Sequence, residues 1–184
     1  MAGEVIRVKG LQEAVAKLNG AKIAGKPARN FLNRWALFTE REGKQNAPVW
    51  RGQLRRSITH ELDHDAFPKS ARVGTNAPHG PYMEHGTGLL SDAPGGGGRH
   101  FPPPAALDAW AIDHGFRPGS RKSAQADAAN APGTYGLLVS QIIWKRGGLK
   151  PRRYLRKAAE ASAGQVPGWL TQMAEEIEGQ AASA

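Results

Sequence analysis

The stretch SDAPGGGGRHFPPP, residues 91–104, most limits how this chain can fold. Four consecutive glycines leave the backbone free, and three consecutive prolines stiffen it and remove backbone N–H donors. No packed helix or strand can form there, so the regular elements must lie before and after it. Gly and Pro together supply 23 plus 13 of the 184 residues, so turns and loops are frequent elsewhere too. We expect flexible loops at about 88–105 and 116–133.

Hydrophobic residues recur at helical spacing in several segments. Leu11, Val15 and Leu18 share one face of a predicted helix over residues 11–18. A second helix is predicted to begin at Pro27 and to end at Asn46. Its apolar face carries Phe31, Trp35 and Phe38. Further helices are predicted over residues 105–115, over residues 134–148, and from about residue 152 to 178, with Pro167 as a kink or a new start.

The strands are predicted to be few and short. Residues 57–62 partly alternate polar and apolar side chains, which is typical of a strand. Residues 63–70 have the composition of a turn, and residues 71–75 are predicted to form the returning strand. Together they predict a hairpin. Residues 5–8 and 81–87 are further strand candidates. We therefore expect an α+β fold, with a small antiparallel β-sheet and a long hairpin packed against several α-helices. Residues 1–184 are expected to form a single domain.

Charge and composition restrict the partners and the chemistry. The net charge is +9, which favours an acidic partner such as nucleic acid, an anionic surface or an acidic protein. The absence of cysteine excludes disulfides, thiolate metal sites and thiol catalysis. No run of 18 apolar residues is present and the start lacks an apolar signal region, so we expect neither a membrane span nor secretion.

The segment NAPHGPYMEHGTG, residues 76–88, is the candidate for chemistry. His79, Glu84 and His85, with His100 further on, carry side chains that can bind a metal. Their spacing matches no known ligand pattern, and on a strand Glu84 and His85 would point to opposite faces. A metal-dependent enzyme is therefore a minor alternative to a structural strand end. We expect no catalytic, cofactor or metal site.

Residues 145–157, KRGGLKPRRYLRK, form the main basic run. Lys145, Arg146, Lys150, Arg156 and Lys157 are candidates for contact with DNA phosphates, and Tyr154 for stacking on a base. No DNA-binding motif accompanies them. A solvated or partner-facing charged patch is the alternative interpretation.

Four motifs, taken in order, resemble the HK97 gp10-like family of tailed-phage proteins. They are VKGLQEAVAKL (8–18), NAPVWRGQLRRSI (46–58), ARVGTNAPHGPYMEHGTG (71–88) and KPRRYLRKAAEAS (150–162). The resemblance implies a non-enzymatic structural protein of the virion, synthesised in the host cytoplasm and placed at the head–tail junction. It would form a neck or tail-completion ring, of six or twelve subunits, that links the connector or head-closure protein to the tail tube or tail terminator. A tail-terminator protein capping the tube, and a non-specific DNA-binding protein, remain the alternatives.

Within that resemblance, some residues are candidates for contacts with other subunits or partners. Gly52 would allow the bend between the long helix and the hairpin, and Gly86 would allow two backbone segments to approach closely. Tyr82 and Glu84 would share one face of the predicted third strand. The candidate interface residues are Arg51, Leu54, Arg55, Arg56, Tyr82, Glu84, Arg152, Arg153 and Tyr154.

Overall fold

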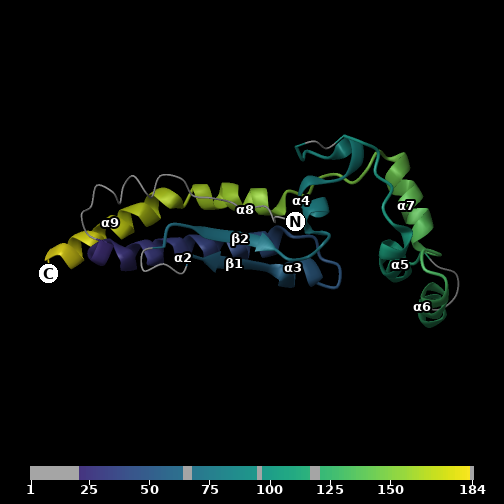
Figure 1. The fold of residues 1–184 in the computed structure, drawn as a ribbon, viewed down its shortest axis with the longest axis horizontal. Coiled ribbons are helices and arrows are strands. Elements are labelled where there is room, and N and C mark those ends of the chain that lie inside the picture. The colour runs from purple at the N-terminus through teal and green to yellow at the C-terminus, as the bar shows by residue number, and fades with distance from the viewer. Residues whose placement is uncertain (1–20, 64–67, 95–96, 117–120, 183–184) are drawn as a thin grey trace. The chain divides into compact units, whose positions relative to one another are not determined.

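The computed structural model describes residues 21–63, 68–94, 97–116 and 121–182. Within these residues lie eight α-helices, one short 3-10 helix and a two-stranded antiparallel sheet (Figure 1). The predicted α+β class is confirmed, while the strand predicted at 5–8 and the helix at 11–18 lie outside the described residues. The chain divides into two compact units. One combines Met1–Gly80 with Arg153–Ala184, and the other is Pro81–Arg152.

Helix α2 (Ala21–Asn46) is the centre of the first unit. Helices α8 (Tyr154–Ala163) and α9 (Val166–Ala182) run along it, as Figure 1 shows. The indole N–H of Trp35 donates to Ser162 Oγ at 3.2 Å, and Phe38 meets Trp169 edge to face at 5.4 Å. Trp35, Leu32 and Phe31 are at most 2% exposed. Burial of each such side chain contributes about 1.5–3 kcal/mol, so this seam supplies much of the unit's core.

The hairpin packs against the same helix. Strands β1 (Ile58–Leu62) and β2 (Ala71–Thr75) pair antiparallel, with Ile58 opposite Thr75 and Leu62 opposite Ala71. Ile58 and Val73 are buried, and both strands contact α2. The predicted hairpin is confirmed, although its strands have only five residues each.

A tight bend and one turn of helix connect α2 to the hairpin. Arg51 and Gly52 both have positive φ, 53° and 69°, which places them in the left-handed region that glycine adopts without strain. The predicted role of Gly52 in the bend is therefore confirmed. Helix α3 (Gln53–Ser57) follows, and it buries Leu54. A helix of five residues is too short to leave a clear helical periodicity in the sequence.

The second unit is mainly helical. Its elements are α4 (Gly80–His85, whose first residue belongs to the other unit), η1 (Gly88–Leu90), α5 (Pro104–Asp113), α6 (Arg121–Asn130) and α7 (Gly136–Lys145). Ala111, Ile112, Ala124, Val139 and Ile143 form the core between α5, α6 and α7. The helices predicted at 105–115 and 134–148 are confirmed as α5 and α7, and the C-terminal helical region is confirmed as α8 and α9. Since α9 begins at Val166, Pro167 marks a new start.

Three predictions about elements were wrong. Residues 81–87 do not form a third strand: Pro81 lies in the first turn of α4, where its fixed φ suits a helix. Residues 116–133 are not all loop, because the alanine-rich segment within them forms α6. Pro27 is not the first residue of its helix. It lies inside α2, where buried Ala24 and Ala28 flank it and their packing outweighs one lost backbone hydrogen bond.

Glu40 links α2 to the hairpin. Its carboxylate accepts from Lys44 Nζ and pairs with Nδ1 of His60, and its side chain is 17% exposed. Partial burial alone would raise the pKa of Glu40. Hydrogen bonds from Lys44 and His60, with their charges, more than offset burial and hold this pKa below its usual 4.5.

We expect Glu40→Gln to lower the free energy of unfolding by about 1–2 kcal/mol at pH 7. Because the folded-state pKa is depressed, the carboxylate stabilises the fold fully above pH 4.5 and loses this effect as pH falls through the folded value. The difference between wild type and variant should therefore shrink below pH 4.5 in urea titrations. Glu42→Gln, which removes a charge from the same helix at an exposed pair with Arg41, is the control. If both variants lowered the free energy of unfolding equally at pH 7, the stabilising role given to the Glu40 carboxylate would be contradicted.

Candidate functional site: an interaction surface

The histidines and glutamate of residues 76–88 do not form one site. His85 Nδ1 lies 3.2 Å from Asp92 Oδ1, whereas His100 stacks on Tyr82 at 5.8 Å between ring centres. His79 is exposed and Glu84 is 2% exposed. Within the described residues no group of three or more His, Cys, Asp or Glu is placed to hold a metal ion. Glu84 is instead buried within α4, while His85 and His100 make separate contacts, with Asp92 and Tyr82.

The two ends of the second unit are joined by backbone hydrogen bonds. The N–H of Arg152 donates to the Met83 carbonyl at 2.8 Å, and the N–H of Thr87 donates to the Leu149 carbonyl at 2.9 Å. Leu149 returns a bond to Thr87 Oγ1 at 3.0 Å. One step further in, the N–H of Leu89 reaches the Gly147 carbonyl at 2.6 Å. We call this pairing of residues 83–89 with residues 147–152 the clasp.

Glycines make the clasp possible. Gly86 has φ 73°, and a Cβ there would overlap the carbonyl oxygen of Leu149. Gly148 has φ 130°, and a Cβ there would overlap the carbonyl of Thr87. The predicted close approach at Gly86 is therefore confirmed. Its partner segment, 147–151, was not foreseen, because long-range backbone pairing leaves no local pattern.

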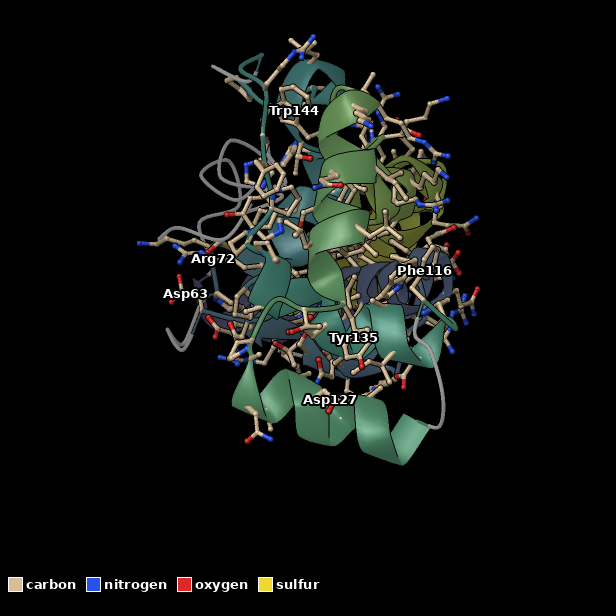
Figure 2. The ribbon with its side chains drawn as sticks, turned by 90° about the vertical axis from the view of Figure 1, so that its right-hand side faces the viewer. Asp63, Arg72, Phe116, Asp127, Tyr135 and Trp144 are labelled. Carbon is tan, nitrogen blue, oxygen red and sulfur yellow. The ribbon has the colours of Figure 1, made fainter. Side chains whose placement is uncertain are left out.

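Asp108 holds the turn that begins α7. Its carboxylate is 6% exposed and accepts three backbone N–H bonds, from Gly133, from Tyr135 at 3.0 Å and from Gly136 at 2.7 Å. Gly136 itself passes so close to α5 that a Cβ would overlap the Pro104 carbonyl. The Tyr135 hydroxyl donates to Asp127 of α6 at 2.9 Å, and both residues are labelled in Figure 2. The role of Asp108 was not predicted, because one aspartate in a helical pattern carries no signal until its hydrogen-bond partners are known.

The outer face of this unit carries aromatic, apolar and basic side chains. The guanidinium of Arg99 lies 4.9 Å from the ring centre of Trp144, which Figure 2 labels on α7. Such a cation–π contact contributes about 0.5–1 kcal/mol at an exposed site. Leu137 and Leu138, at the other end of α7, are 45% and 52% exposed. Helix α7 therefore buries one face in the core and presents a second, partly apolar face to its surroundings.

Comparison with known protein families gives a match over the first part of the chain. Residues 9–86 match the HK97-gp10-like family. Its description is "Bacteriophage HK97-gp10, putative tail-component". The match covers 78 of 184 residues, and it includes α2, α3, the hairpin and α4. No curated protein and no solved structure matches the chain.

The HK97-gp10-like match confirms the predicted resemblance over these residues and supports a structural role connected with the phage tail. It ends at residue 86, so most of the second unit, including α5, α6 and α7, lies beyond it. No helix in the described ranges is both long and apolar enough to cross a membrane.

The structure divides the predicted basic run between the two units. Lys145, Arg146, Lys150 and Arg152 are exposed in the second unit. Arg156 and Lys157 are exposed on α8 of the first unit, preceded by Arg153, which is exposed and has φ 54°. The candidate DNA-facing residues therefore do not belong to a single element, and contact with DNA remains a prediction.

The candidate interface residues differ in burial. Arg51, Arg55 and Arg56 are exposed around α3, and Tyr82 is 51% exposed on α4. Leu54, Glu84 and Tyr154 are buried, at 3%, 2% and 0% exposed. Tyr82 and Glu84 lie on a helix instead of a strand, which explains why one is exposed and the other buried. A part in subunit contacts remains a prediction for the exposed residues, and the buried ones can act only by shaping their surroundings.

We expect Asp108→Asn to loosen the helical part of the second unit. The amide nitrogen would face a backbone N–H where a carboxylate oxygen now accepts, which costs about 2–3 kcal/mol. Hydrogen exchange followed by mass spectrometry should show faster exchange in peptides covering α5 and α7. Asp127→Asn is the control, because its amide oxygen can still accept from Tyr135. Unchanged exchange in Asp108→Asn would contradict the role given to this carboxylate.

Proposed function

We propose that this chain is a structural protein of the phage head–tail junction, where copies form a neck or tail-completion ring between the connector and the tail tube. The observation that carries the proposal is the match of residues 9–86 to a tail-component family. The exposed apolar and basic side chains support it, because such surfaces are typical of proteins that bind neighbours. We propose no catalytic role.

Light scattering on a sizing column, followed by negative-stain imaging, tests the ring. We expect closed rings of six or twelve copies. The masses should be about 118 and 236 kDa, from 19.7 kDa per copy. Open filaments or a strictly monomeric protein at all concentrations would contradict a ring that forms from this chain alone. Stoichiometric bound metal in elemental analysis would instead favour an enzyme.

A tail terminator capping the tail tube is the nearest alternative. Both roles need a ring, so the two differ in the neighbour that the ring binds. Incubation with isolated tails and with DNA-filled heads of the same phage separates them. Binding to heads supports a neck ring, whereas binding only to tail ends supports a terminator.

Contact with DNA is a second candidate function, favoured by residues 145–157, which contain seven Lys or Arg and no Asp or Glu. We expect weak, sequence-independent binding whose affinity falls with salt, with a log–log slope of about −0.9 for each phosphate contacted on duplex DNA. Fluorescence anisotropy with a labelled duplex measures this. Arg156→Ala with Lys157→Ala should reduce the slope by about two, whereas Arg72→Ala, at an exposed position of β2, is the control. No affinity at low salt would exclude this candidate.

A further inference from the structure

Helix α7 carries an exposed row of side chains with one charged end. Leu137, Gln141 and Lys145 are spaced four residues apart and are all exposed. Leu138 and Trp144, beside the row, are 52% and 38% exposed. The other face of the same helix places Val139 and Ile143 in the core. The buried residues on the opposite face of α7 therefore hold the row in position. Within the described residues Lys145 forms no ion pair.

Helix α9 carries a row of the same pattern with the opposite charge. Leu170, Ala174 and Glu178 are also four residues apart and are all exposed, with Leu170 at 39%. Met173 and Ile177, on the other face, are buried. In the part of the chain that the structure describes, Glu178 forms no ion pair either. From residue 158 onward the chain has four glutamates and no lysine or arginine.

We propose that the α7 row of one copy docks on the α9 row of a second copy, so that these two helices form the contact between neighbouring subunits. Rows of side chains four residues apart are the ridges that interlock when helices pack against each other. Both rows extend over nine residues, which is eight steps of 1.5 Å or about 12 Å. Parallel packing sets Leu137 beside Leu170, Gln141 beside the small Ala174, and Lys145 beside Glu178. Antiparallel packing would set each charge against a leucine.

Charge complementarity favours a second copy as the occupant. Residues 145–157 carry only basic charges and residues 158–184 only acidic ones, so the chain contains both halves of the contact. The leucines argue against DNA as the occupant of the α7 row, because phosphates are bound by cations and polar groups. The two rows lie on different helices of one chain, so the contact is heterologous and can propagate from copy to copy until it closes. The inference rests on the proposed ring and names its interface.

Cysteine cross-linking tests the contact directly, because the chain contains no cysteine of its own. Gln141→Cys and Ala174→Cys are prepared as separate single variants, mixed and oxidised. If the rows meet, Cα atoms at these positions come within the range of about 4.4–6.8 Å that a disulfide needs. We expect a disulfide-linked dimer containing one copy of each variant. Because each variant has one cysteine, a bond within one chain cannot produce this signal. Gln45→Cys, exposed on α2, replaces Gln141→Cys in the control mixture.

Charge reversal supplies an independent measurement. Lys145→Glu alone and Glu178→Lys alone should each weaken association about tenfold, because like charges then face each other. The chain carrying both changes should recover most of the wild-type association, measured by sedimentation velocity. If the single changes weakened association by damaging the fold, the double change would damage it further. Recovery of association in the double variant would therefore show that the two charges face each other.

The outcomes separate this inference from the proposed function. Rings without the mixed dimer would overturn the α7–α9 contact and leave the ring standing. The mixed dimer without closed rings would support the contact and count against the ring. Absence of both assembly and cross-linking would overturn both.

Discussion

The first unit depends on Tyr154, at the point where the chain returns to it. The ring of Tyr154 is fully buried, and its hydroxyl donates to the carbonyl of Gly80 at 3.4 Å. Gly80 is the last residue of the first segment, and a Cβ on it would overlap the side chain of Thr75. Residues 80 and 154 are therefore neighbours in space although 74 positions separate them. This contact lies at the first residue of α8, the helix with which the chain resumes its packing along α2.

The clasp holds the two ends of the second unit together. A segment of 72 residues that leaves and re-enters at one point must bring its own ends together, at an entropic cost that grows slowly with its length. Four hydrogen bonds hold those ends as a pair, and four glycines with positive φ, at positions 86, 88, 147 and 148, allow the close approach. The Asp108 carboxylate then organises the helices further out. Each unit is thus closed by contacts of its own.

Local patterns predicted the elements whose signal extends over several turns or over a matched pair of strands. Helix α7 followed from the helical spacing of hydrophobic residues over 134–148, and the hairpin from the partial alternation of residues 57–62, a turn, and a second short segment at 71–75. The prediction failed where the pattern was short, as for α4, and where an alanine-rich segment was taken for loop, as for α6. The buried state of Leu54, Glu84 and Tyr154 could not be predicted, because burial depends on segments distant in sequence. The exposed rows on α7 and α9 became visible only once the opposite faces of both helices were known to be covered.

The closed ends of Pro81–Arg152 also make this chain a scaffold with a replaceable part. The unit is attached at two adjacent backbone positions, 80 and 153, so its length and content can change without moving α2, the hairpin or the C-terminal helices. Exchange of this segment leaves the family-matching residues 9–80 unchanged and replaces only the last six residues of the match, 81–86. For the protein engineer, the same two positions are a place to graft a reporter domain whose own termini lie close together.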